Sequence, residues 1–217
     1  MTTLSDQYTA VGTGQGMRRA LLEAGLQQAR EAGPDGIGLS EAARRVGVTA
    51  DAAHAHFPDR ESLVRAVYSA SQAALAQSIE TRLEAVVGAD VSSPAARARA
   101  RLKAVGAGYL QFAQTEPGLF RTAFSVPEDL RRTTSPQNAG DSGRTPYQLL
   151  GSVLDEWVAA GLLPAERRIG AEVLAWAPVH GLAVLAVDGP LRSLDPRDLQ
   201  RIMGSVLDMV TNGMQPR

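Results

Sequence analysis

Residues 39–63, LSEAARRVGVTADAAHAHFPDRESL, decide the fold of this 217-residue chain. The apolar residues between 39 and 46 recur at spacings of three and four, which predicts one buried face of a short helix. They are Leu39, Ala42, Ala43 and Val46. Gly47 ends this helix, and Thr49 is a good N-cap for a second helix over residues 50–56.

A third helix follows the second one almost at once. Phe57-Pro58-Asp59 breaks the second helix, and Asp59 can cap a helix that begins at Arg60. The small residues Ala43 and Gly47 allow two of these helices to cross closely. Two short helices joined by a tight turn form the layout of a helix-turn-helix, whose second helix enters the major groove of DNA.

The same residues resemble the DNA-binding domain of the tetracycline-repressor (TetR) family of bacterial transcription regulators. The positions that match the family pattern are Ala43, Gly47, Val48, Thr49, His56, Phe57, Asp59 and Leu63. A preceding helix, expected at about 17–32, also fits. It has small or apolar residues where the family has them, at Ala20, Leu21, Ala24, Ala29 and Gly33.

Helical patterns separated by proline and glycine fill the rest of the chain. Helices are expected at 60–87, 94–115, around Leu119–Phe124, and at 147–161, 165–187 and 195–212. Residues 127–146 read as a mobile loop, and no alternating strand pattern is present. The predicted class is therefore all-α. It comprises a disordered tail (1–16), a three-helix helix-turn-helix domain (17–64) and a larger α-helical domain (65–217).

The second half carries a resemblance of its own. Segments 108–124 and 175–185 resemble the ligand-binding domain of one TetR subgroup, which is marked by a Trp-x3-His-Gly signature. Here the signature is Trp176, His180 and Gly181, and the spacing of four places the first two on one helical face. Pro178 should kink this helix locally. The resemblance implies that residues 65–217 bind a ligand and form a dimer.

Composition bears on the charge of the expected DNA-binding domain and on the cellular compartment. The net charge is −1, and the first 67 residues hold seven arginines against eight acidic residues, so the expected DNA-binding domain is not basic. The absence of cysteine fits a reducing cytoplasm. No secretory signal and no apolar run long enough to span a membrane are visible, so we expect a cytoplasmic protein.

The TetR resemblance implies roles for residues near the turn. Thr49, His56 and Arg60 are expected to contact DNA phosphates, Arg60 in bidentate fashion. His54 stands where the family has a tyrosine that usually touches a phosphate. The groove-facing positions are Ser40, Ala50, Asp51 and Ala52. Because these side chains are small, we expect modest direct readout of bases and more readout of DNA shape.

Each of these assignments has an alternative. His54 and His56 can be simple surface residues, and their spacing of two points their rings apart on a helix, so we expect no metal site. Arg44 and Arg45 fit a solvated face better than a base-reading one. Trp176 with His180 can be a packed core pair or a ligand contact.

The other aromatic residues gather in the second half of the chain. Each can be a core residue, but their gathering suits an apolar ligand cavity. They are Tyr109, Phe112, Phe120, Phe124 and Trp157.

The resemblance as a whole implies a repressor that binds double-stranded operator DNA and is released by a small-molecule effector, without a cofactor. The helices near 165–187 and 195–212 are expected to form a homodimer. Their apolar residues are Val173, Leu174, Leu182, Leu185, Ile202, Val206, Leu207 and Met209. An all-α enzyme or small-molecule-binding protein, or a helical adaptor, remains the alternative. Against an enzyme, no nucleophile triad, phosphate loop or metal-spaced carboxylates are apparent.

Overall fold

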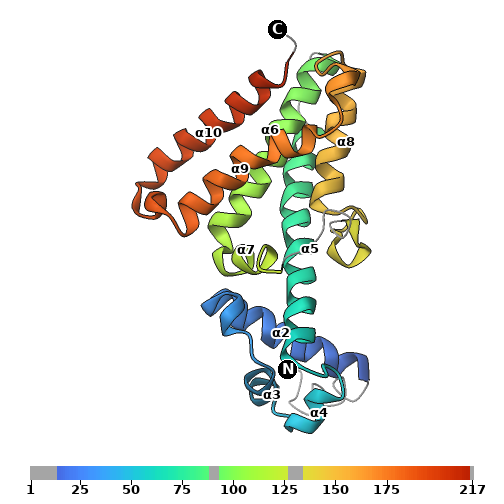
Figure 1. Ribbon diagram of the computed structural model, residues 1–217, viewed down its shortest axis with the longest axis vertical. Coiled ribbons are helices and arrows are strands. Elements are labelled where there is room, and N and C mark those ends of the chain that lie inside the picture. The colour runs from blue at the N-terminus through green and yellow to red at the C-terminus, as the bar shows by residue number, and fades with distance from the viewer. Residues whose placement is uncertain (1–13, 88–92, 127–133, 216–217) are drawn as a thin grey trace, which may run out of the picture. The chain divides into compact units, whose positions relative to one another are not determined.

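The computed structural model describes residues 14–87, 93–126 and 134–215, and within these ranges the regular structure is entirely helical (Figure 1). The predicted all-α class is therefore confirmed. Contacts divide the chain into two units, residues 1–71 with 116–127 and residues 72–115 with 128–217. The predicted tail lies mostly outside the described residues, but its last part, from Gly14, already belongs to the first helix.

The first unit holds the helix-turn-helix. Its elements are α2 (Gly14–Ala32), the 3-10 turn η1 (Pro34–Gly36), α3 (Leu39–Val46), α4 (Ala50–His54), the start of α5 (Arg60–Val87) and α7 (Pro117–Ala123). Helix α4 ends two residues before the predicted boundary. The amides of His56 and Phe57 both donate to the carbonyl of Ala53, which tightens the last turn.

Small residues let the helices of this unit pack closely. A Cβ atom added to Gly25 of α2 would lie 2.8 Å from Val67 of α5. A Cβ atom on Gly118 of α7 would lie 2.1 Å from the carbonyl oxygen of Ala29 in α2. Leu21, Ile37, Phe57, Leu63 and Val67 fill the core between these helices. Residues 116–126, which follow α6 in sequence, thus pack with the helix-turn-helix unit.

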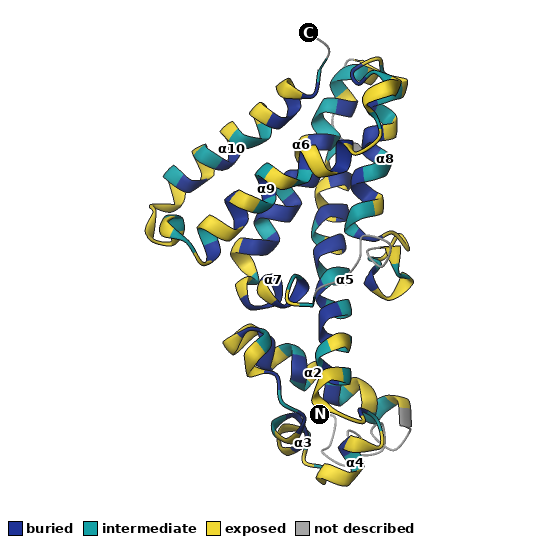
Figure 2. Ribbon diagram, viewed as in Figure 1, coloured by how far each residue is buried: buried dark blue, intermediate teal, exposed yellow. Residues whose placement is uncertain are grey.

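The second unit is built around α6 (Pro94–Thr115). This helix contacts α8 (Pro146–Ala159), α9 (Ala171–Val187) and α10 (Pro196–Gly213), so it carries a largely buried face (Figure 2). Gly108 brings α6 against the second part of α5, since an added Cβ atom would lie 2.7 Å from the Cα atom of Ile79. Within the described ranges, no helix combines the length and apolar character needed to cross a lipid bilayer.

Two expectations about connecting segments need correction. Helix α9 begins at Ala171 rather than at 165, because residues 165–167 form a 3-10 turn and Gly170 takes the left-handed conformation, with φ 77°. The described part of the expected mobile loop, residues 134–145, is anchored to α5 by hydrogen bonds. The buried carboxylate of Glu80 accepts hydrogen bonds from the amides of Asp141 (3.0 Å) and Ser142 (3.2 Å).

Candidate functional site

The turn between α3 and α4 has the predicted geometry. Gly47 adopts φ 79° and ψ 33°, a left-handed conformation that is open to glycine at little cost. Its amide and that of Val48 both donate to the carbonyl of Ala43, at 2.9 and 3.0 Å. Thr49 caps α4, since its Oγ1 accepts from the amide of Ala52 at 3.2 Å. These local bonds make the helix-turn-helix.

The residues proposed to face the DNA groove are mostly at the surface. Ser40 in α3 and Ala50 and Asp51 in α4 are exposed, and Ala52 is half-buried. Ala53 is fully buried and anchors α4 to the core. The outer face of α4 is thus a row of short side chains, which limits direct hydrogen bonding to base edges.

His54 and His56 differ in their surroundings. His54 is exposed, and its Nδ1 lies 3.0 Å from the carbonyl oxygen of Pro58. A carbonyl only accepts, so the hydrogen of the neutral ring belongs on Nδ1 and leaves Nε2 as an acceptor. His54 can then donate to a phosphate only when doubly protonated. His56 is half-buried and lies beyond the end of α4.

Arg60 braces the connection between α2 and α3. Its Nε donates to the carbonyl of Ile37 at 2.7 Å, and its Nη2 donates to those of Pro34 (3.1 Å) and Asp35 (3.3 Å). The predicted bidentate phosphate clamp would need nitrogens that these carbonyls already occupy, so a phosphate contact would fall to Nη1. Asp59 caps α5, accepting from the amide of Ser62 at 2.6 Å, and this bond lowers the pKa of its carboxyl.

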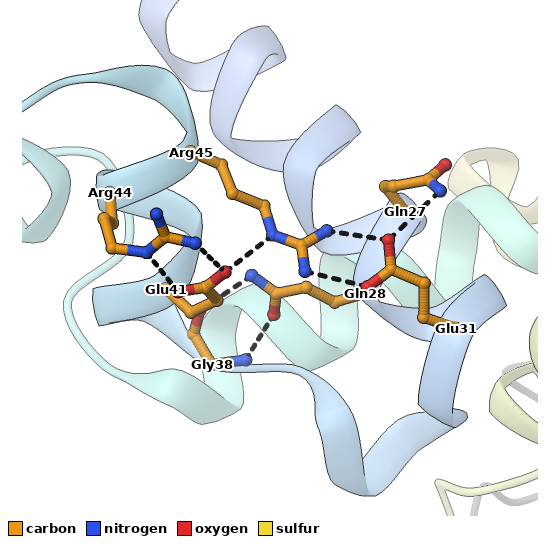
Figure 3. Close-up of polar contacts among 7 residues, drawn as sticks. All are labelled: Gln27, Gln28, Glu31, Gly38, Glu41, Arg44 and Arg45. Atoms are coloured by element: carbon orange, nitrogen blue, oxygen red, sulfur yellow. Dashed lines mark hydrogen bonds and ion pairs between the residues drawn. The ribbon is translucent and has the colours of Figure 1, made fainter.

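The arginines of α3 are paired rather than simply solvated (Figure 3). Glu41 accepts from Nε and Nη2 of Arg44, both at 2.7 Å, and from Nε of Arg45 at 2.9 Å. Arg45 also reaches Glu31 of α2, at 3.0 and 2.8 Å. Hydrogen bonds from Arg44 and then Arg45 lower the pKa of Glu41 to about 2. Arg44 is nonetheless largely exposed, as a solvated face predicts, whereas the side chain of Arg45 is only 29% exposed.

The sequence reasoning missed one basic residue near the turn. The guanidinium carbon of Arg18, in α2, lies 4.8 Å from the ring centre of Phe57, which follows α4. This cation–π contact brings a positive charge next to the end of α4. The adjacent Arg18 and Arg19 at the start of a helix were the only signal in the sequence.

The second unit holds a polar cluster among aromatic side chains. The hydroxyl of Tyr109 in α6 lies 2.6 Å from Nδ1 of His180 and accepts from Nε1 of Trp176 at 3.1 Å. Since the indole only donates, the tyrosine hydrogen is available for Nδ1, which favours the hydrogen of His180 on Nε2. Burial raises the pKa of Tyr109 and lowers the pKa of His180.

The remaining aromatic candidates make contacts of their own. Trp157 in α8 is fully buried, and its Nε1 donates to the carbonyl of Ala98 at 2.8 Å. Phe112 is buried on α6. Phe120 and Phe124 belong to the first unit, where their ring centres lie 5.2 Å apart. Of the seven predicted ligand-binding residues, Tyr109, Trp176 and His180 are joined to one another by hydrogen bonds.

Comparison with protein families and solved structures fits this architecture. The family described as "Bacterial regulatory proteins, tetR family" matches residues 21–67. The family described as "Tetracyclin repressor-like, C-terminal domain" matches residues 102–210, just over half of the chain. No match is found among curated proteins.

Solved structures share the fold over nearly the whole chain. A protein of unknown function from Rhodococcus sp. RHA1 is 25% identical, with 92% of this chain and 96% of that chain covered and a TM-score of 0.71. The regulator FadR from Bacillus subtilis, in complex with stearoyl-CoA, is 18% identical (92% and 99%, TM-score 0.63). A TetR-family regulator from Pectobacterium atrosepticum is 16% identical (100% and 99%, TM-score 0.63).

Regulators of this kind bind DNA operators, respond to small molecules and act as dimers rather than as enzymes. Both family matches follow one another in the expected order along the chain. The chain belongs to the TetR family of bacterial regulatory proteins and is a DNA-binding transcriptional regulator.

Proposed function

We propose that this regulator is a cytoplasmic repressor that leaves its operator when a small molecule binds the second unit. The observation that carries the proposal is the capped helix-turn-helix of α3 and α4, with exposed residues at the groove-facing positions. Helix α5 is shared by the two units, so it offers a continuous path between effector and DNA. The effector must bind the two arrangements unequally to shift the equilibrium.

At the DNA, we assign two kinds of contact. Thr49, with His56 and the protonated form of His54, positions the protein on phosphates. The short side chains read bases and DNA shape, and these are Ser40, Ala50, Asp51 and Ala52. The contacts of Arg60 with three carbonyls support a change in its role. We assign it mainly to hold the α2–α3 connection, with at most a single phosphate contact through Nη1.

For the effector, we propose a site bounded by Tyr109, Trp176 and His180. Their hydrogen-bonded cluster offers a fixed polar group beside aromatic rings, which is the composition of many small-molecule sites. Trp176 and His180 of the Trp-x3-His-Gly signature belong to this cluster, which supports the proposed subgroup. FadR from Bacillus subtilis, which has the same fold, was solved with stearoyl-CoA.

We further propose that α9 and α10 form the homodimer. Apolar residues of α9 and α10 lie at the surface, including Leu174, which is 62% exposed, and Met209, which is 56% exposed. Ile202 and Val206 line a groove on α10 beside Met209. Two residues of the predicted interface lie elsewhere. Leu182 is buried in the core, and Leu207 packs against Gly106. A pair of helices from each subunit would make an isologous four-helix interface.

The experiment that tests DNA binding is a titration of random duplex DNA at rising salt. We expect binding at low salt and a steep loss of affinity as salt rises, because phosphate contacts release counterions. Absence of binding at low salt would overturn the proposed function. With duplexes of defined sequence in place of random DNA, Ser40→Ala or Asp51→Asn should change the preferred sequence, whereas Arg60→Ala should weaken binding to all sequences about equally.

A further inference from the structure

The carboxylate of Glu41 holds Arg44 in the geometry that a DNA phosphate would use. Nε and Nη2 of Arg44 each donate to a different oxygen of Glu41, both at 2.7 Å (Figure 3). This parallel, two-bond arrangement is how guanidinium groups bind carboxylates and phosphates alike. Glu41 thus occupies the donors with which Arg44 would otherwise grip the DNA backbone.

Glu41 is also fixed in place by its neighbours. Nε of Arg45 donates to Glu41 at 2.9 Å, and the two Nη atoms of Arg45 donate to Glu31 of α2. Gln28, which is 2% exposed, bonds both the amide and the carbonyl of Gly38, the residue before α3. Isolated surface ion pairs contribute little, but bidentate pairs within a network are the exception. The Glu41 carboxylate is therefore held in place, so it loses little conformational entropy when it binds Arg44.

Arg44 lies where DNA can compete for it. It stands four residues after Ser40, so both lie on the same face of α3, and its side chain is 73% exposed. The first helix of a helix-turn-helix crosses the DNA backbone. Arg45, by contrast, has all three guanidinium nitrogens bonded to carboxylates of α2 and α3. Of the two arginines, Arg44 is the one that a phosphate can take over.

We propose that Glu41 is a specificity-determining residue that withholds Arg44 from DNA until the operator is correctly docked. This inference rests on the proposed DNA-binding function. On random DNA, an arginine that must first leave Glu41 gains little from a phosphate. On the operator, the other contacts hold a phosphate in place, so the exchange from Glu41 to phosphate becomes favourable. Glu41 thereby lowers non-specific binding more than specific binding.

Protonation cannot release Arg44 under ordinary conditions. The arginine hydrogen bonds lower the pKa of Glu41 to about 2, so the carboxylate stays ionised far below neutral pH. Only a competing anion, such as a phosphate oxygen, can then free the guanidinium. The hold of Glu41 on Arg44 should therefore not change with pH, but it should depend on where the DNA places its phosphates.

Glu41→Gln tests the proposal in the intact protein. With a random duplex at fixed salt, we expect the affinity to rise roughly two- to fivefold, because a neutral amide holds Arg44 far less strongly. With a duplex enriched from a random pool by the wild-type protein, the affinity should rise less, so the ratio of specific to random affinity falls. Glu61→Gln is the matched control, since Glu61 also pairs with an exposed arginine one turn away, Arg65. It should leave that ratio unchanged.

Arg44→Gln gives an independent test. The structure predicts that this change weakens binding to the enriched duplex but alters random-duplex affinity less than twofold, because the wild-type arginine is withheld there. In the double variant Glu41→Gln/Arg44→Gln, the gain on random DNA should vanish. Equal losses on both duplexes for Arg44→Gln, or a Glu41→Gln gain that persists without Arg44, would overturn the inference. Failure of the wild type to bind any duplex would instead overturn the proposed function.

Discussion

The helix-turn-helix of the first unit and the Tyr109 cluster of the second unit both present polar groups, but their surroundings are opposite. Around α4, Ala50, Asp51 and His54 face solvent, and the structural hydrogen bonds come from caps and backbone. In the second unit, the Tyr109 hydroxyl is buried and bonded to side chains of α9. Exposed polar groups can exchange protein partners for water at little cost, whereas buried polar groups must keep their hydrogen-bond partners. Substitutions should therefore affect DNA binding more in the first region and stability more in the second.

The largest effect is expected for Trp157→Ala. The side chain is fully buried and bonded to Ala98, so its removal leaves a cavity and should lower the free energy of unfolding by about 3–5 kcal/mol. Chemical denaturation of wild type and variant measures this. A loss below about 1 kcal/mol, the size expected outside the core, would show that Trp157 does not belong to the core.

Tyr109→Phe should have the next largest effect. It removes the oxygen that Trp176 and His180 both contact, and disrupting such buried bonds costs about 1–3 kcal/mol. The loss is read from chemical denaturation. Tyr147→Phe, at a half-buried tyrosine of α8, is the control and should change stability far less. Equal losses in the two variants would contradict the importance of the cluster.

Thr49→Ala should cost about 1 kcal/mol of stability, the usual value of a lost N-cap. It should also weaken DNA binding, because it frees the first turn of α4. Thr49→Ser keeps the hydroxyl and should restore both the stability and the affinity. If serine restores neither, the effect comes from the lost methyl group rather than from the cap.

The smallest effect concerns pH and His180, which is only half-buried. Burial lowers its pKa in the folded protein, so the unfolded chain binds a proton first as the pH falls. Folded-state stability should therefore be lost as the pH drops through the ordinary histidine pKa of about 6.5. We expect His180→Gln to lose less stability than wild type between about pH 8 and about pH 5 in thermal denaturation. If wild type and His180→Gln showed the same pH dependence of stability, the lowered pKa of His180 would be contradicted.

The sequence predicted the first region better because its structure is local. Gly47 and Thr49 act on residues within four positions, so spacing alone indicates the turn and the cap. The brace by Arg60 was missed, since its partner carbonyl at Ile37 lies 23 positions away. The pairing of Arg45 with Glu31 depends likewise on how α2 packs against α3.

In the second region, the sequence indicated which residues matter but not how they group. The spacing of Trp176 and His180 predicted a common face, and both do contact Tyr109. That tyrosine lies 71 positions from His180, beyond the reach of any periodicity. Trp157 was placed among the ligand-binding candidates only by residue type, and its Nε1 instead donates to the carbonyl of Ala98 in α6.

Amide hydrogen exchange of the intact protein, with and without saturating duplex DNA, tests the contrast between the two regions most directly. DNA contact at α3 and α4 predicts that added protection concentrates in residues 39–60, whereas the amides around Tyr109 and His180 do not gain comparable protection. DNA-dependent protection that spares residues 39–60, or that is strongest around α6 and α9, would contradict the assignment of the DNA interface.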